Sequence, residues 1–255
     1  MSAQPTSDDS ARLTRAHVVP FAVFMAFMIV LQLVAAQIEW KHPDAPWWRQ
    51  DPAHFIYPLQ TLVTLGFLAY YRKNYCFRGS WKWSLIAMIF GTVGIGFWLL
   101  PTTLYDYWGL EGKTTGLLGL LGVDARRDGF DPSIFQNQAT WWLVVLLRFF
   151  RAVVVVALVE EIFWRGFLMR FVCDWEGDYW KQPFGRAHWK SFLVVTGMFV
   201  LAHGRVDYAA AIVYGSLTYL LCVWSKSLGA CVVMHATANL LMGLYVMAYG
   251  KYGLW

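Results

Sequence analysis

Two adjacent glutamates lie in an otherwise apolar part of the chain. Residues 157–171 read ALVEEIFWRGFLMRF and place Glu160, Glu161 and Arg165 among aliphatic and aromatic side chains. At the centre of a bilayer a charged side chain costs about 2.5–3.5 kcal/mol on insertion scales, so such residues pair with one another or serve a function. Glu161 and Arg165 are spaced i, i+4 with the acid first, which is the favoured order for an ion pair along a helix. We therefore predict that these two residues form a structural pair.

Glu160 is left without this partner. On a helix it projects about 100° away from Glu161, so it cannot share Arg165 well. Desolvation in an apolar cavity tunes a carboxylate toward the proton affinity that a general base needs near neutral pH. The alternative interpretation is a second acid held by a hydrogen bond in a purely structural network. The residues downstream favour the catalytic interpretation.

Two later motifs supply imidazoles and an amide. The segment MFVLAHGR places Phe199 and His203 four residues apart near the end of an apolar run, and VVMHATANLL does the same for His235 and Asn239 in the last run. The two members of each pair share a helix face. Together with Glu160, these side chains could form a small polar chamber inside a helical bundle.

This set of groups suits the activation of water. Glu160 would take a proton from water with the help of His203, while His235 and Asn239 would donate hydrogen bonds to the developing oxyanion of a peptide carbonyl. A metal alternative stays open, in which Glu160, His203 and His235 bind one zinc ion that keeps a water in its open position. Because no HExxH motif places two ligands on one helix, we favour the scheme without metal.

The composition indicates that membrane helices position these groups. The chain has 255 residues, 58% hydrophobic and only 15% charged, whereas a soluble domain has about 25% charged residues. By the ~20-residue criterion there are about seven apolar runs, at 18–38, 54–71, 84–103, 139–172, 190–204, 208–225 and 227–249. We predict an all-α polytopic transmembrane bundle of about seven to eight helices with an internal polar cavity. It forms one domain over 1–255, with a polar tail at 1–17, a re-entrant or surface segment at 104–137 and catalytic helices at 139–249.

Loop charges predict the orientation of this bundle. Basic residues gather in the N-terminal tail and in the loops 72–83 and 173–190, whereas the alternate loops are mixed or acidic. The positive-inside rule then places the N-terminus in the cytoplasm and the protein in the cell (inner) membrane. These loops account for the net charge of +5, so we expect no nucleic-acid partner.

Two arginines and four further histidines lie outside the predicted catalytic set. Arg148 and Arg151 lie inside the apolar run that carries Glu160 and could mark an interface or bind an anionic substrate terminus. The remaining histidines lie near run ends or in loops, where we expect them in water; they are His17, His42, His54 and His188.

The motifs, in their order on three hydrophobic helices, resemble those of the CPBP family. This family contains the type II CAAX prenyl endopeptidases and their bacterial relatives, and its motifs appear here as EExxxR at Glu160, FxxxH at Phe199 and HxxxN at His235. The resemblance implies an intramembrane endopeptidase with Glu160 and His203 as the catalytic acid/base pair. It also implies an oxyanion site at His235 and Asn239. It leaves the cofactor open between none and zinc.

The resemblance also suggests partners. Its substrate would be a membrane protein or a lipid-anchored peptide in the lipid bilayer. The segments VVPFAVFMAF and FWRGFLMRF resemble the subgroup that accompanies exosortase-type sorting, which implies a protein-sorting transpeptidase system nearby. Some members act as scaffolds or immunity proteins, so the alternative function is a non-catalytic membrane partner. In either case Glu161, Arg165 and Phe199 would support the site structurally.

Overall fold

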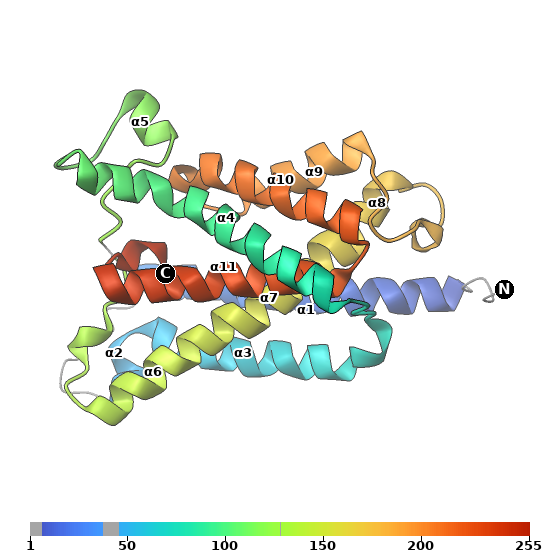
Figure 1. Ribbon diagram of the computed structural model, residues 1–255. Coiled ribbons are helices and arrows are strands. Elements are labelled where there is room, and N and C mark those ends of the chain that lie inside the picture. Colours follow the sequence, from blue (N-terminus) through green and yellow to red (C-terminus); the bar gives the residue numbers. More distant parts are fainter. Residues whose placement is uncertain (1–6, 38–45, 128) are drawn as a thin grey trace.

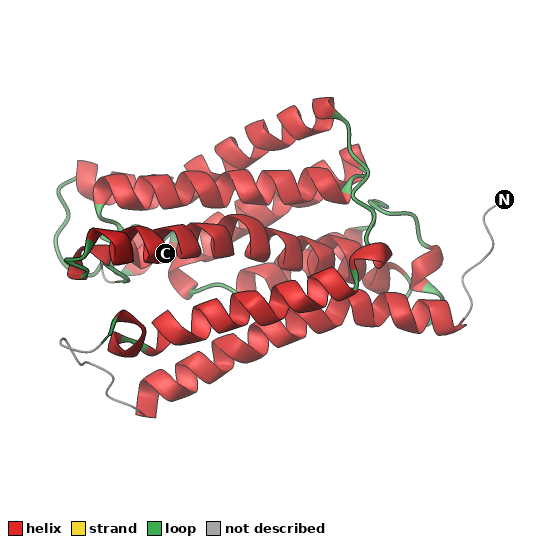
Figure 2. Cartoon of the chain, turned by 90° about the horizontal axis from the view of Figure 1, so that it is seen from below, coloured by secondary structure: helices red, strands yellow, loops and turns green. Residues whose placement is uncertain are grey.

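The computed structural model describes residues 7–37, 46–127 and 129–255, and these residues fold into helices joined by loops (Figure 1). Within the described ranges there is no strand, so the predicted all-α fold is confirmed (Figure 2). The α-helices are α1 (Ser7–Gln37), α2 (Trp47–Gln50), α3 (Pro52–Tyr70), α4 (Trp81–Tyr107), α5 (Gly116–Leu120), α6 (Gln138–Phe150), α7 (Ala157–Glu161), α8 (Met169–Cys173), α9 (Trp189–Leu201), α10 (Tyr208–Ser225) and α11 (Leu228–Tyr249).

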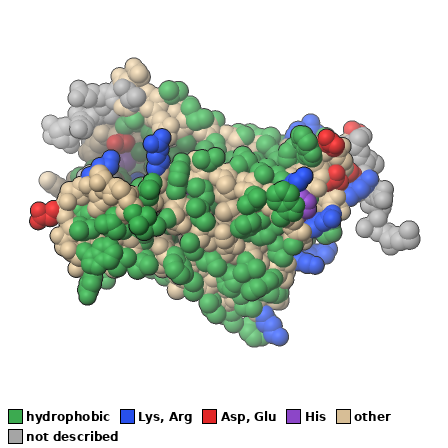
Figure 3. Space-filling model, turned by 90° about the horizontal axis from the view of Figure 1, so that it is seen from above, with side chains coloured by type: hydrophobic (Ala, Val, Ile, Leu, Met, Phe, Trp, Pro, Cys, Tyr) green, Lys and Arg blue, Asp and Glu red, His purple; other side chains and the backbone are tan. Residues whose placement is uncertain are grey.

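Every predicted apolar run corresponds to a helix. Among the described residues, five helices are long and apolar enough to cross a membrane, namely Asp8–Ala35, Trp81–Tyr107, Gln138–Cys173, Arg205–Ser225 and Leu228–Tyr249. Hydrophobic side chains cover much of the face seen in Figure 3, and Lys and Arg lie mainly toward its ends. The chain is a multi-pass membrane protein, as its composition predicts.

The helix that carries the two glutamates is irregular. Gln138–Cys173 is a continuous helical segment of 36 residues, drawn in yellow-green to gold in Figure 1. Two of its stretches are π-helical, Arg151–Val156 and Ile162–Leu168, and α7 lies between them. Because π-helical turns are rare and occur often at functional sites, they single out α7 within this long helix.

Two predicted boundaries were wrong. Helix α9 ends at Leu201, not at 204, because Gly204 and the polar residues after it form a turn and a short 3₁₀ segment at Arg205–Asp207. Residues 7–17 of the predicted polar tail are helical and form the start of α1, where Asp8 and Asp9 lie in the first turn and favour a helix N-terminus. Residues 104–107 form the end of α4, and the described residues of 108–137 contain the short helices Gly116–Leu120 and Pro132–Ile134.

The expectation for the other histidines was also wrong in part. His17 and His54 are buried, with exposed fractions of 4% and 5%. His17 packs between Tyr75 and Trp180, and aromatic side chains likewise cover His54. His42 lies outside the described residues.

A close helix contact places α4 against the last helix. Helix α4 packs along α11 and also contacts α10. A Cβ atom on Gly91 would lie 2.6 Å from the carbonyl oxygen of Met234 in α11. A small residue is required there, as is common between packed membrane helices.

This contact predicts a difference between two glycines of the same helix. Gly91→Ala should lower the free energy of unfolding by about 1–3 kcal/mol, because the methyl group must push two backbones apart. Gly96→Ala is the control, since a Cβ there meets nothing within 4 Å, and it should leave the melting temperature unchanged or raise it. Thermal unfolding in detergent measures both. Equal melting of the two variants would contradict the close contact.

Candidate active site

An internal polar cavity lies between α4, α9, α10 and α11. Its volume is about 210 Å³, which is enough for several water molecules. Its polar lining consists of Trp98, His203, Asp207, Tyr214, His235 and Asn239. Three of the four residues predicted to be catalytic therefore meet at one cavity.

His203 lies in the turn that follows α9. Its Nδ1 is 2.7 Å from the backbone oxygen of Phe199, a carbonyl near the helix end that lacks a helical partner because the N–H of His203 bonds to Val200 instead. The Trp98 ring packs edge-on to the imidazole, with 5.1 Å between ring centroids. These contacts fix the ring and leave Nε2 for a ligand in the cavity.

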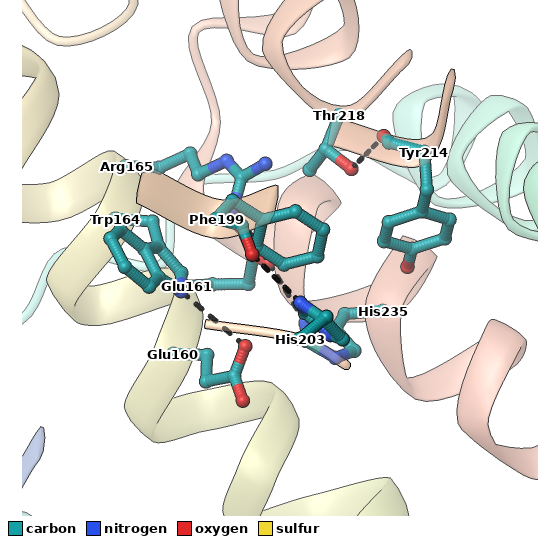
Figure 4. A network of polar contacts seen from close by, with 9 residues as sticks. All are labelled: Glu160, Glu161, Trp164, Arg165, Phe199, His203, Tyr214, Thr218 and His235. Carbon is teal, nitrogen blue, oxygen red and sulfur yellow. Dashed lines mark hydrogen bonds and ion pairs between the residues drawn. The ribbon is translucent and has the colours of Figure 1, made fainter. Parts of the chain in front are cut away.

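The pair predicted from spacing is present and has a third member. Arg165 Nη1 lies 3.3 Å from Glu161 Oε1, and His235 Nδ1 from α11 lies 2.9 Å from the same oxygen (Figure 4). All three side chains are buried. An ionised Glu161 accepts the Nδ1–H of His235 and so leaves Nε2 as the atom available to the cavity.

Asn239 connects the cavity to the irregular helix. Its Nδ2 donates a hydrogen bond of 2.7 Å to the backbone oxygen of Ala152, which lies in the first π-helical stretch. The altered hydrogen bonding of a π turn frees carbonyl groups for such contacts. One amide N–H thus holds α11 against this helix, and the second N–H is available to a ligand.

Glu160 lies beside the cavity and is not one of its lining residues. Its Oε2 accepts a hydrogen bond of 3.4 Å from Trp164 Nε1, and it does not pair with Arg165. It is close enough to His235 for an electrostatic interaction, and Figure 4 shows its carboxylate on the side of the helix where the imidazoles lie. A side-chain rotation or an intervening water would connect it to the cavity, as is common in unliganded active sites.

Further residues of the site are Tyr214, Asp207 and Trp98. Tyr214 is 3% exposed and its hydroxyl has no hydrogen-bond partner among the described residues. Asp207 accepts a hydrogen bond of 3.1 Å from Trp98 Nε1 and forms an ion pair with Arg126. Tyr214 and Trp98 occur in apolar helical segments, where their sequence context indicates ordinary core residues.

The zinc alternative does not fit this arrangement. Over the described ranges, no three His, Cys, Asp or Glu side chains form a group that could hold a metal ion. Glu160, the third residue of the zinc set, does not line the cavity that His203 and His235 share.

Comparison with known proteins places the site within a family. Residues 140–241 match the family model described as Type II CAAX prenyl endopeptidase Rce1-like. No curated protein and no solved structure matches the chain. The matched residues include every motif from Glu160 to Asn239, and the match does not assign the exosortase-associated subgroup. Over residues 140–241 the chain is therefore similar to the type II CAAX prenyl endopeptidase-like proteins of the CPBP family.

Proposed function

We propose that this protein is an intramembrane endopeptidase that hydrolyses a peptide bond of a membrane-tethered protein. One observation carries the proposal: His203, His235 and Asn239 line one polar cavity beside Glu160, within the matched part of the chain. A buried chamber in a membrane bundle gives the peptide bond access to water that lipid would exclude.

The placement of these groups supports the following reaction. Glu160 removes a proton from a water that His203 positions, and the water oxygen forms a bond to the carbonyl carbon. The carbonyl oxygen becomes an oxyanion, which Nε2–H of protonated His235 and the amide of Asn239 stabilise. Glu161 supports the charged imidazole through Nδ1. The C–N bond then breaks, the proton on Glu160 passes to the leaving amine, and the products are a carboxylate and an amine.

A direct test uses purified protein and membranes from cells that lack it. New N-termini of membrane proteins should be produced during incubation, as measured by N-terminal peptide mass spectrometry. They should persist after treatment with a chelator, because the proposed reaction uses no metal. Complete loss on chelation, restored by zinc, would contradict the metal-free scheme. An unchanged set of N-termini would favour the non-catalytic scaffold.

A further prediction concerns the substitution of Tyr214. Its buried hydroxyl lacks a partner among the described residues, so a water or substrate carbonyl in the cavity would satisfy it. Tyr214→Phe should lower kcat/KM by roughly tenfold, the value of about one hydrogen bond, without loss of melting temperature. Tyr219→Phe is the control, since its hydroxyl donates to the His188 oxygen at 3.0 Å; it should lose stability and keep activity. If Tyr214→Phe instead loses stability and keeps activity, Tyr214 does not act on the substrate.

The contacts of the loops support the predicted orientation. The loop after α3 and the loop after α8 both touch the first turns of α1: Tyr75 bonds to the Ala16 oxygen at 2.8 Å, and Thr14 lies 2.6 Å from the Tyr179 hydroxyl. The basic loops therefore gather at one end, at the right in Figure 1. We propose that this end faces the cytoplasm. Cys76, which is exposed there, should react with an impermeant thiol reagent only in inside-out vesicles.

A further inference from the structure

A second cavity contains two arginines and lies away from the active site. It is formed between α2, α3 and α6, and its polar lining includes His54, Tyr57, Arg148 and Arg151. The cavity has a volume of about 40 Å³, which is room for roughly three water-sized groups. It shares no lining residue with the catalytic cavity.

The two guanidinium groups form their hydrogen bonds and ring contacts with residues other than Asp and Glu. Arg151 donates to Gln60 Oε1 at 2.8 Å and lies 4.0 Å from the Tyr57 ring centroid. Arg148 donates to the backbone oxygen of Trp255 at 3.2 Å and lies 4.3 Å from the Phe130 ring centroid. In the parts of the chain that the structure describes, no Asp or Glu forms an ion pair with either arginine.

This arrangement calls for an anion. A cation removed from water is costly unless an opposite charge or a full set of hydrogen bonds compensates it. A second observation points the same way: His54 is 5% exposed, its Nδ1 bonds to the Trp47 oxygen at 2.7 Å, and its Nε2 has no partner among the described residues. Two guanidiniums and an imidazole nitrogen therefore converge on one small cavity whose lining contains no Asp or Glu.

The surroundings indicate which anion would enter. Exposed apolar side chains occur on α3 and α6, the helices that line the cavity: Phe55, Leu59, Leu62, Leu143 and Leu146. Tryptophans at the same end, Trp48 and Trp142, are also exposed and are typical of the level of lipid headgroups. A phosphodiester fits the planar donor pattern of arginine, and its acyl chains would lie along the apolar side chains.

We propose that the cavity lined by His54, Arg148 and Arg151 binds the phosphate of an anionic phospholipid. By the orientation proposed above, this lipid belongs to the outer leaflet, because α2 and the start of α6 lie at the end opposite the start of α1 (Figure 1). The lipid would fasten α3 to α6, and its binding does not depend on whether the protein cleaves peptides.

The test compares lipids and variants of the full-length protein. Purified protein in neutral detergent receives phosphatidylglycerol or phosphatidylcholine, and native mass spectrometry and thermal unfolding report binding. The wild type should prefer phosphatidylglycerol, and Arg151→Gln should lose about tenfold in affinity for it, the value of one charge-assisted hydrogen bond. Arg151→Lys keeps the charge and should retain part of the preference. It controls for misfolding as the cause of lost binding in Arg151→Gln. Lys190→Gln, an exposed cation in α9 at the opposite end, should behave like the wild type.

Three outcomes would overturn the proposal. The first is a wild type that binds both lipids equally. The second is equal competition by inorganic phosphate, which would identify a soluble anion as the ligand. The third is phosphatidylglycerol binding that appears only after Glu39→Gln, Asp44→Asn and Asp128→Asn are combined, since these acids lie outside the described residues and one of them would then be the native partner.

Discussion

Glu160→Gln should reduce peptide hydrolysis by about 10²–10⁴-fold, the usual contribution of a general base. The amide has nearly the same shape as the carboxylate and can still accept the hydrogen bond from Trp164 Nε1, but it cannot take a proton from water. Melting temperature should therefore remain that of the wild type. The measurement is the rate at which the new N-termini appear. Glu176→Gln, at an exposed loop position, is the matched control and should keep full activity.

The same variant separates the protease from its alternative. Full activity of Glu160→Gln would falsify the assignment of this residue as the base. If the protein is a scaffold, binding of its partner should survive the change, because the fold is preserved. A protease should lose its product and keep its partner or substrate bound, so a pull-down together with the product assay distinguishes the two functions.

Glu161→Gln should have the opposite profile, with a large loss of stability. The carboxylate is fully buried and holds both Arg165 and His235. Removal of one partner of a buried ion pair leaves the other charge uncompensated and costs about 3–5 kcal/mol. Thermal and denaturant unfolding in detergent measure this loss. Lys181→Gln is the control, because its pair with Asp178 is 48% and 26% exposed and such surface pairs contribute about 0–1 kcal/mol.

A double variant distinguishes the ion pair from general damage. Glu161→Leu combined with Arg165→Leu removes both charges and should recover part of the stability that Glu161→Gln loses, since apolar replacement of a whole buried pair is often neutral. It should not recover activity, because His235 loses the acceptor for its Nδ1–H. If Glu161→Gln melts like the wild type, the network of Glu161, Arg165 and His235 does not stabilise the bundle.

The structure changes the role of Glu161. From spacing alone it belongs to a clamp with Arg165, and the clamp is present. Its bond to His235 makes it a positioning residue as well, since it determines which imidazole nitrogen faces the cavity. The proposed stabilisation of the oxyanion therefore depends on the acid that the sequence assigns only to structure.

Sequence by itself determined the features that depend on local spacing and composition. Apolar runs predict helices because lipid leaves backbone groups no partner except one another. The i, i+4 rule predicts the contact of Glu161 with Arg165 because both lie on one helix. The motifs identify Glu160, His203, His235 and Asn239 as candidates in advance of any structure, although their catalytic roles remain a proposal.

Only the tertiary structure decided which residues meet across helices. A periodic pattern specifies the face of a helix, but not its neighbour, its rotation or its depth, so the contact between Glu161 and His235, 74 positions apart, has no local signal. For the same reason Tyr214 was missed, and Glu160 lies beside the cavity and not on its lining. His203 occupies a turn because Gly204 and the polar residues after it end α9 early. The polar cavity forms by tertiary packing between helices that are far apart in the sequence, and no short segment specifies that packing.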